Sequence, residues 1–249
     1  MLDILNQILT TSRVTDEAGK SYILHSHTTP PQLKFLNEII ITKQLKRGLE
    51  IGLAYGISAL QILDSLNTVT SSFVYVVIDP YQTDWNNVGK LNIQRSGLAQ
   101  NVLLYELPSD QVLPQLVNEG KTFDFVYLDS TKVFDVLMVD VHYLTELLSI
   151  GGVIVLDDCD YPGIRLLVRF LKKHPSYRLY GGFNKEVKSR WGMMASLVSH
   201  WSLKLIPFRE RYIKRLDISS DEVLGVNYKC LAFEKIANDN RQWNWHCRF

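Results

Sequence analysis

The sequence predicts an α/β protein built on a mostly parallel sheet, and two observations predict it. Short apolar runs rich in Val, Ile and Tyr alternate with segments whose apolar residues recur at helical spacing. Strands with continuous apolar runs, separated by helices, are typical of a parallel sheet that is covered on both faces and joined by right-handed crossovers. Because such sheets bind ligands at the carboxyl ends of their strands, we expect the functional site there.

The length and composition predict a single domain spanning residues 1–249. The chain has 249 residues, of which 46% are hydrophobic, which is enough for one substantial core and short enough for one domain. The 27 basic and 26 acidic residues leave a net charge of +1, so no global field attracts a polyanion or an anionic membrane. We therefore expect no nucleic-acid partner and no membrane association.

The cysteines and the first residues predict a cytoplasmic protein. Cys159, Cys230 and Cys247 have no paired or CxxC spacing, which suits a reducing compartment rather than a disulfide framework. The opening stretch "MLDILNQILTTSRV" lacks a basic region and carries Asp3 within its apolar run, unlike a secretory signal. No apolar run approaches the roughly 20 residues of a membrane span.

Seven short apolar runs predict the strands. They cover residues 47–52, 73–79, 102–106, 123–129, 152–156, 177–181 and 228–235. The clearest helix covers residues 133–148, where apolar residues recur every three to five positions and Gly151 and Gly152 follow as a stop. This helix would carry the chain from one buried strand to the next.

Two segments interrupt the alternation of strands and helices. Residues 1–45 precede the first strand and form a longer connection than usual, which we interpret as an N-terminal helical extension. Residues 184–227 form a polar and aromatic insertion before the last strand, which we interpret as helices broken near Pro207. Its apolar residues keep helical spacing, which favours packing against the domain or against a second subunit in a homo-oligomer. A substrate lid is the alternative.

The stretch "LEIGLAYGISAL" at residues 49–60 predicts a ligand-binding turn after the first strand. Gly52 and Gly56 frame the turn, and Ser58 stands in the first turn of the next helix, so a ligand could approach the backbone amides. The dinucleotide fingerprint GxGxxG is not matched, because Ala54 and Ile57 replace its later glycines. This mismatch argues against an NAD-dependent oxidoreductase, which we keep as the alternative enzyme class.

The spacing E-x-G-x-x-x-G resembles the first motif of class I S-adenosylmethionine-dependent methyltransferases, whose turn holds the amino-acid end of the cofactor. The resemblance implies a set of cofactor contacts in this turn, namely Glu50, Gly52, Ala54, Tyr55, Gly56 and Ser58. It also implies that Asp79, followed by Pro80, binds both ribose hydroxyls, since a carboxylate accepts two hydrogen bonds. A solvated aspartate at the strand end is the alternative. Ser109 begins the helix after the third strand, where this fold commonly contacts adenine, although it would also serve as an N-cap.

Three aspartates end the fourth and fifth predicted strands. Asp129 closes "FDFVYLD", and Asp157 and Asp158 follow "GGVIVL". Adjacent parallel strands would gather these carboxylates at one edge of the sheet, where they repel unless a cation neutralises them. Oxygen ligands alone favour magnesium, with calcium or manganese as other candidates. Capping of the following helices is the alternative.

These aspartates, together with Lys132 three residues after Asp129, resemble the pattern of catechol O-methyltransferase and its metal-dependent relatives, including the macrocin type. The stretches "IDPYQTDWNNVGKLNIQRSGL", "FDFVYLDSTKVFDVLMVDVHYL" and "NRQWNWHCRF" are similar to a bacterial family of uncharacterised class I methyltransferases. The resemblance covers nearly the whole chain. It implies a Rossmann-like sheet of seven strands in the order 3-2-1-4-5-7-6, whose last inserted strand is antiparallel.

The resemblance implies an S-adenosylmethionine-dependent O-methyltransferase that acts on a small hydroxylated acceptor. Magnesium held by Asp129, Asp157 and Asp158 would orient the acceptor oxygens, and Lys132 would take the proton. Asp129 would also contact the cofactor and act beside Lys132 in catalysis. The bacterial family often carries DGxH where this chain has Asp129 and Lys132. A lysine can replace that histidine if a neighbouring cation lowers the pKa of the lysine. The alternative is that Lys132 is an exposed lysine near a helix start.

A non-catalytic binding module on the same fold is a third hypothesis for the function. We assign no role to His25 and His27.

Overall fold

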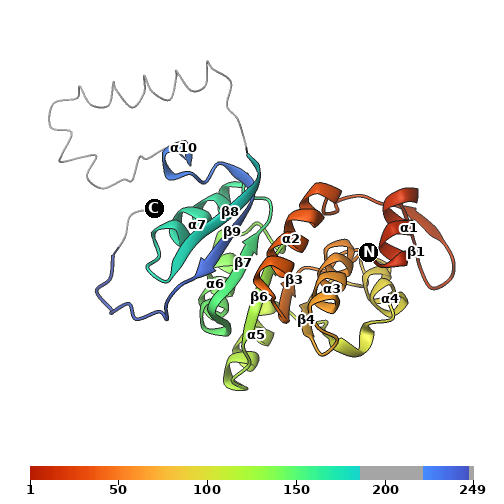
Figure 1. Cartoon of the computed structure of the whole chain (residues 1–249), viewed down its shortest axis with the longest axis horizontal. Helices are drawn as coiled ribbons and strands as arrows, with labels where there is room; N and C mark the ends of the chain where they lie inside the picture. Colours follow the sequence, from red (N-terminus) through yellow and green to blue (C-terminus); the bar gives the residue numbers. More distant parts are fainter. Residues whose placement is uncertain (186–220, 247–249) are drawn as a thin grey trace, which may run out of the picture.

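The computed structural model describes residues 1–185 and 221–246, and its centre is a seven-stranded sheet (Figure 1). The strands are β3 (Arg47–Ile51), β4 (Val74–Ile78), β5 (Val102–Tyr105), β6 (Phe123–Leu128), β7 (Leu148–Leu156), β8 (Tyr177–Lys185) and β9 (Tyr228–Lys235). They lie in the order β5-β4-β3-β6-β7-β9-β8. Counted within this sheet, the order is 3-2-1-4-5-7-6, as the family resemblance implies. The predicted α/β class with a mostly parallel sheet is confirmed.

One strand of the sheet runs against the others. β9 pairs antiparallel with both β7 and β8, whereas β3 pairs parallel with β4 and β6, β4 with β5, and β6 with β7. The antiparallel strand is therefore the last one in the chain, inserted between β7 and β8. The carboxyl ends of β3, β4, β5 and β6 consequently lie at one edge of the sheet, where this class of fold binds ligands.

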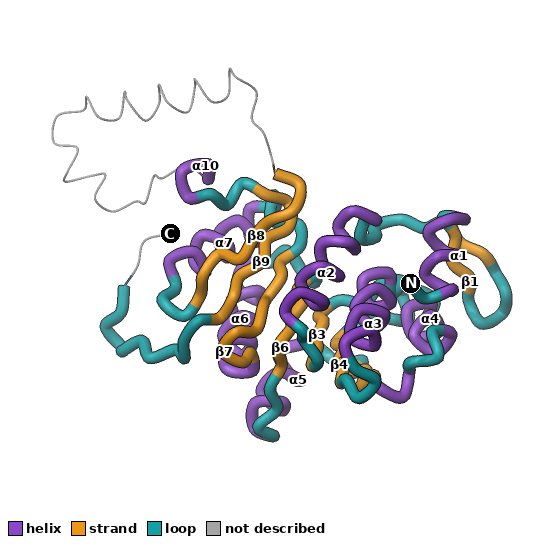
Figure 2. Tube along the Cα trace, viewed as in Figure 1, coloured by secondary structure: helices purple, strands orange, loops and turns teal. Residues whose placement is uncertain are grey.

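Helices cover both faces of the sheet (Figure 2). They are α1 (Asp3–Thr11), α2 (Pro30–Lys43), α3 (Ile57–Val69), α4 (Val88–Arg95), α5 (Ser109–Asn118), α6 (Phe134–Leu147), α7 (Pro162–Lys173) and the short α10 (Asp221–Leu224). A 3-10 turn, Ala99–Asn101, precedes β5. Within the described residues, no helix combines the length and apolar character needed to cross a membrane.

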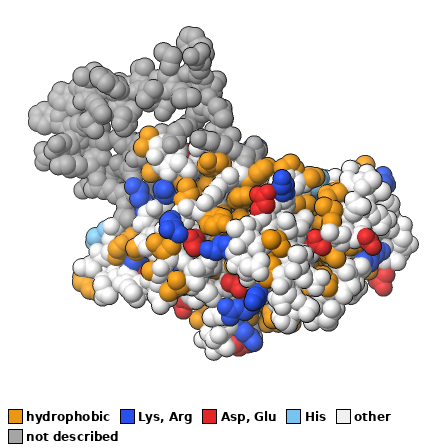
Figure 3. Space-filling model, in the orientation of Figure 1, with side chains coloured by type: hydrophobic (Ala, Val, Ile, Leu, Met, Phe, Trp, Pro, Cys, Tyr) orange, Lys and Arg blue, Asp and Glu red, His pale blue; other side chains and the backbone are white. Residues whose placement is uncertain are grey.

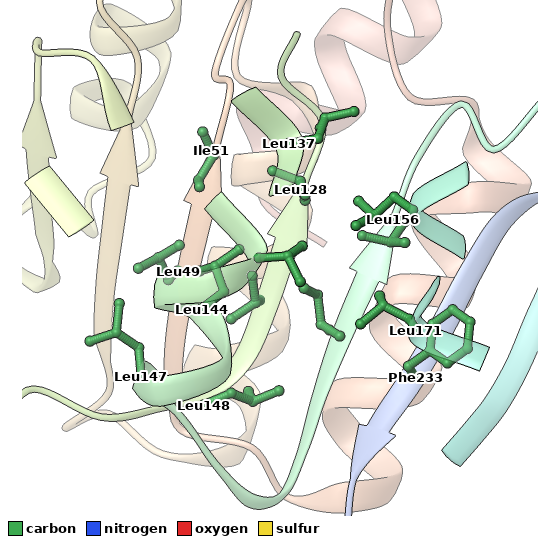
Figure 4. Close-up of a cluster of buried hydrophobic side chains, with 14 of the residues drawn as sticks. Leu49, Ile51, Leu128, Leu137, Leu144, Leu147, Leu148, Leu156, Leu171 and Phe233 are labelled. Carbon is green, nitrogen blue, oxygen red and sulfur yellow. The ribbon is translucent and has the colours of Figure 1, made fainter. Parts of the chain in front are cut away.

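The two faces explain why the strands are continuously apolar. On one face, Leu49 and Ile51 of β3 and Leu128 of β6 pack in one cluster with Leu137 and Leu144 of α6 (Figure 4). Neighbouring residues along the strands point to the opposite face and pack in a second cluster with α2 and α3; they include Tyr75, Val77, Phe125 and Tyr127. Each buried Leu or Ile contributes about 1.5–3 kcal/mol relative to its exposed state. Both sides of the central strands are therefore hydrophobic.

The N-terminal extension contains more than the predicted helices. Between α1 and α2 lies an antiparallel hairpin of β1 (Arg13–Thr15) and β2 (Ser21–Ile23). Buried residues of α1, including Leu5 and Ile8, cluster with Leu60 of α3. The extension thus packs on the main domain. Much of the predicted 184–227 insertion lies outside the described residues.

The boundary between α6 and β7 differs from the prediction. The helix ends at Leu147 and β7 begins at once with Leu148. Gly151 and Gly152 therefore lie within the strand rather than after the helix. The register between β6 and β7 shifts near Phe123 and Phe125, opposite this part of β7. The two glycines thus mark an irregularity of strand pairing, which is a common role of glycine in strands.

The surface carries both signs of charge. On the face shown in Figure 3, Lys and Arg side chains lie among Asp and Glu side chains. This distribution agrees with the net charge of +1. Among the described residues, the face in that view carries no extended basic surface of the kind that attracts nucleic acid.

Candidate functional site

The turn between β3 and α3 is shaped by its glycines. Gly52 has φ of 96° and Gly56 has φ of 78°, both in the left-handed region. A Cβ atom on Gly52 would also collide with the carbonyl oxygen of Asp129, at the end of β6. Gly52 is therefore required both by its backbone conformation and by the close approach of β6. Ala54 adopts φ of 48°, a conformation that costs energy for a residue with a Cβ atom.

Asp79 fastens this turn to the end of β4. Its Oδ2 accepts hydrogen bonds from the backbone amides of Leu53 and Ala54, both at 3.0 Å, and from Nε2 of Gln82 at 2.8 Å. Its Oδ1 accepts the amide of Tyr81 at 2.8 Å. Asp79 is buried, so these bonds are well shielded from water.

Four amides of the turn thereby donate within the protein. Besides the two that Asp79 accepts, the Gly52 amide donates to the carbonyl of Ile78, and the Gly56 amide donates to that of Leu53. The glycine spacing predicts that a ligand meets backbone amides in this turn. The structure shows that these four donate within the protein instead. These four amides are therefore not available to a ligand.

Glu50 lies behind the turn rather than on the cavity wall. Its two carboxyl oxygens accept hydrogen bonds from Ser58 Oγ and Tyr75 Oη. Burial raises the pKa of Glu50 from 4.5 to about 8, although both hydrogen bonds favour the charged form. Glu50 thus connects β3 to α3 and β4 through these two hydrogen bonds. With a pKa of about 8, its carboxyl group is mostly protonated at neutral pH.

Glu50→Gln should therefore change how stability depends on pH. In the folded protein Glu50 keeps its proton up to about pH 8, whereas in the unfolded chain it loses the proton near pH 4.5. Between these values the unfolded state binds fewer protons, so wild-type stability falls as pH rises. The glutamine has no proton to lose. Urea unfolding should show the variant gaining about 2 to 3 kcal/mol relative to wild type between pH 5 and pH 8. Parallel pH profiles would contradict this prediction.

A cavity of about 470 Å³ opens at the carboxyl ends of the strands, a size typical of small-molecule sites. Eight of the ten predicted cofactor residues line it, namely Gly52, Ala54, Tyr55, Ser58, Asp79, Pro80, Ser109 and Asp129. Glu50 and Gly56 are absent from the wall. Four strand ends that are far apart in the sequence thus meet at one cavity, as expected from a parallel sheet.

The cavity has a second wall that the sequence motifs do not indicate. Ser26, His27 and Thr28, just before α2, line it together with Tyr81 and Trp85 after β4. Burial lowers the pKa of His27. The only signal in the sequence is the position of "LHSHTTPP" immediately before a proline-initiated helix.

The aromatic residues of this wall support one another. Tyr55 Oη lies 3.0 Å from Nε2 of His25, and the rings of Tyr55 and Trp85 meet edge to face with centroids 4.8 Å apart. Aromatic pairs in this arrangement add about 0.5–1.5 kcal/mol beyond their burial. His25, which has no predicted role, therefore connects the N-terminal extension to the turn.

The three predicted metal ligands are engaged elsewhere. Asp157 accepts hydrogen bonds from Tyr127 Oη at 2.6 Å, from Gln32 Nε2 at 2.6 Å and from the Asp158 amide at 2.7 Å. Asp129 and Asp158 pair with Lys132 instead. Within residues 1–185 and 221–246, no group of three or more His, Cys, Asp or Glu residues could hold a metal ion. Asp157 instead takes part in a buried network with Tyr127 and with Gln32 of α2.

Lys132 also differs from its predicted state. Burial alone would lower its pKa, but Asp129 and Asp158 together raise that pKa above its ordinary value. A general base at neutral pH would need the opposite shift. Burial also raises the pKa of Asp129, and that of Asp157 to about 6. Lys132 is therefore an ammonium ion in this arrangement and serves as a hydrogen-bond donor.

Comparison with known proteins shows which family the domain resembles. Residues 49–159 match the model of a family described as a methyltransferase domain. This match covers less than half of the 249 residues. Catechol O-methyltransferase of Mycobacterium tuberculosis is 29% identical over 157 residues, covering 58% of this chain and 68% of that protein. Caffeoyl-CoA O-methyltransferase 1 of Eucalyptus globulus is 28% identical over 138 residues, covering 55% of this chain and 54% of that protein. The chain thus spans about half the length of this plant relative.

Solved structures share the fold of the methyltransferase domain. An O-methyltransferase from Bacillus cereus in complex with SAH superposes with a TM-score of 0.57 at 23% identity, covering 71% of this chain and 81% of that chain. An O-methyltransferase from Streptomyces achromogenes, involved in tomaymycin synthesis and solved with SAM, gives a TM-score of 0.57 at 20% identity and the same coverage. The predicted resemblance to class I methyltransferases is confirmed by the family model, the curated relatives and the shared fold together. The predicted enzyme class agrees with every relative named here.

Proposed function

We propose that this chain transfers the methyl group of S-adenosylmethionine to a hydroxyl group of a small acceptor. The observation that carries the proposal is the cavity at the carboxyl ends of β3, β4 and β6 and the start of α5. Eight of the residues that line it are predicted cofactor contacts. The cofactor supplies a methyl group on a sulfonium, which is a strong electrophile. The chain must then bind it, place the acceptor oxygen in line and exclude water.

The polarity of the turn supports a cationic cofactor over a dinucleotide. Four of its amides donate within the protein, whereas Asp129 and residues of the turn line the cavity. A ligand with an ammonium and a sulfonium group is attracted by a carboxylate and by backbone carbonyls. A pyrophosphate would be repelled by the same carboxylate. This arrangement favours the methyltransferase over the NAD-dependent alternative.

The other cavity walls fit the remaining parts of the cofactor. Asp79 and Pro80 would lie near the ribose, and Ser109 at the start of α5 would lie near the adenine, as the resemblance implies. Asp129 stands at the boundary between the cavity and Lys132, whose ammonium lies 3.0 Å from Asp129 Oδ1. We place the acceptor hydroxyl at this boundary. Lys132 would there donate a hydrogen bond to the acceptor oxygen. The proton of the hydroxyl would pass to the Asp129 carboxylate as the new C–O bond forms and the C–S bond of the sulfonium breaks, which releases S-adenosylhomocysteine.

Magnesium, which the aspartate pattern predicts, does not fit the described residues. Both oxygens of Asp157 already accept hydrogen bonds, and Lys132 stands between the other two aspartates. We therefore assign no step of the reaction to a metal ion. A cytoplasmic location, a homo-oligomer and the absence of a nucleic-acid partner stay predictions of the sequence.

Calorimetry and an acceptor screen test the proposed function together. We expect binding heat with S-adenosylmethionine and with S-adenosylhomocysteine, and none with nicotinamide cofactors. Phenolic, catecholic and sugar acceptors should then be screened for release of S-adenosylhomocysteine. Binding of a nicotinamide cofactor alone would favour the oxidoreductase. Binding of S-adenosylmethionine without turnover on any acceptor would favour the non-catalytic module.

A further inference from the structure

One ammonium group bridges two carboxylates at the carboxyl ends of β6 and β7. Lys132 Nζ lies 3.0 Å from Asp129 Oδ1 and 2.8 Å from Asp158 Oδ2. We propose that Lys132 is a built-in counter-ion that occupies the place of a divalent cation and presents its remaining N–H to the acceptor oxygen. The claim that Lys132 donates to the acceptor oxygen is the catalytic half of this proposal, and it rests on the proposed function. The claim that Lys132 takes the place of a divalent cation is the ionic half, and it rests on the geometry of these three side chains.

The backbone holds Lys132 in this position. Gly163, at the start of α7, lies so close to the Lys132 carbonyl oxygen that a Cβ atom on the glycine would collide with it. Asp158 has φ of 50°, a left-handed conformation that few residues other than glycine adopt. The loops after β6 and β7 are therefore set by close packing and by an unusual backbone conformation. The backbone positions of the paired residues are fixed in this way. Forming the ion pairs therefore costs less conformational entropy than it would between two flexible surface side chains.

Asp157 cannot complete a cation site beside this bridge. Its Oδ2 accepts a hydrogen bond from Tyr127 Oη. Its Oδ1 accepts hydrogen bonds from the Asp158 amide and from Nε2 of Gln32 in α2. Releasing Asp157 would leave the buried Gln32 and Tyr127 groups without an acceptor, at a cost of about 1–3 kcal/mol each. Asp157 is thus an anchor for α2, the helix that begins just after the cavity-lining residues 26–28.

The electrostatic balance favours the lysine. A hard divalent cation seeks six or more oxygen ligands, whereas the bridge offers two carboxylates that one ammonium already neutralises in part. A cation entering between them would meet the ammonium at close range, with strong repulsion in a partly buried site. The lysine is 28% exposed, so water screens this repulsion only partly.

The bridge also predicts the class of acceptor. An ammonium has three N–H donors, of which two serve Asp129 and Asp158. One donor is left, so the site needs only one oxygen on the acceptor. A divalent cation would instead favour chelation by two adjacent oxygens. We therefore expect single hydroxyl groups, such as those of simple phenols, to be methylated without a neighbouring hydroxyl.

A manganese titration of the ligand-free protein tests the ionic half without any turnover. Mn²⁺ binding is followed by electron paramagnetic resonance for the wild type, Lys132→Gln, Lys132→Arg and Lys229→Gln. Lys132→Gln should bind Mn²⁺ at least about ten-fold more tightly than wild type, because two carboxylates lose their counter-ion. Lys132→Arg keeps the charge and should resemble wild type. Lys229 is exposed, and the ion pair that it forms among the described residues is with Asp160 at 3.8 Å; it provides the matched control and should also resemble wild type.

Tight Mn²⁺ binding by the wild type, equal to that of Lys132→Gln, overturns the proposal. If Lys132→Gln fails to fold, the wild type still tests the proposal, because tight Mn²⁺ binding by the wild type alone overturns it and weak binding supports it. A second arm treats the wild type with a chelator and compares simple phenols with catechols as acceptors. Turnover that persists without metal, with phenols accepted, supports the catalytic half, whereas turnover that only added metal restores overturns it. Absence of S-adenosylmethionine binding would refute the proposed function but leave the manganese result valid.

Discussion

Gly52→Ala should greatly weaken the binding of S-adenosylmethionine and destabilise the fold. The new Cβ atom would collide with the backbone oxygen of Asp129, and the residue would have to hold φ of 96°. Backbone atoms cannot rotate away as a side chain can, so the turn and the end of β6 must move apart. We expect the dissociation constant measured by calorimetry to rise at least roughly 100-fold, which is about 2.7 kcal/mol. Urea unfolding should show a loss of about 4 kcal/mol or more.

Gly120→Ala is the matched control for this substitution. Gly120 also has a left-handed φ, of 65°, but a Cβ atom there would meet nothing within 4 Å. It should therefore cost only the conformational strain, about 1–2 kcal/mol, and leave cofactor affinity unchanged. If Gly52→Ala bound S-adenosylmethionine as tightly as Gly120→Ala, the cavity beside this turn would not be the cofactor site.

The elements of the fold could be predicted because burial on both faces leaves a clear pattern in the sequence. Val76 and Ile78 pack on one side of the sheet and Tyr75 and Val77 on the other, so β4 reads as an uninterrupted apolar run. The start of β7 could not be predicted, for the opposite reason. Its first residues are irregularly paired and include glycines, which carry no strand pattern. The order of the strands came from the resemblance to methyltransferases.

The site was predictable in its location but not in its contacts. The residues at strand ends converge because parallel strands share one edge, and this requires no knowledge of side-chain orientation. The partner that each carboxylate selects depends on residues far away in the sequence. Asp157 turns toward Gln32, which is 125 positions earlier, rather than toward Asp129. Motif spacing cannot indicate such a choice, so it located the cavity but not the contacts that Asp157 makes.

The role of Asp79 is where motif and structure differ most, and its substitution should have a large effect on the ligand-free protein. Asp79→Ala leaves four donors without their acceptor, of which the Leu53 amide and Gln82 Nε2 are the most buried. An unsatisfied buried donor costs about 1–3 kcal/mol. We expect urea unfolding without ligand to show a loss of about 3 to 5 kcal/mol, and calorimetry to show much weaker binding of S-adenosylmethionine.

Asp79→Asn separates fastening of the turn from binding of the ribose. The amide oxygen of the asparagine can replace Oδ2 and accept hydrogen bonds from Leu53, Ala54 and Gln82. Its amide nitrogen then faces the backbone N–H of Tyr81, so that two donors meet without an acceptor. The ligand-free variant should lose about 1–3 kcal/mol. Asp84→Ala, exposed in the same loop, should change stability by less than about 0.5 kcal/mol. A carboxylate that served only the ribose would give a different result: unaltered ligand-free stability in both Asp79 variants and a loss confined to cofactor affinity. Oδ2 already accepts three hydrogen bonds and Oδ1 accepts one, so any ribose contact must use Oδ1. We therefore expect the Asp79 variants to lose both ligand-free stability and affinity for the cofactor.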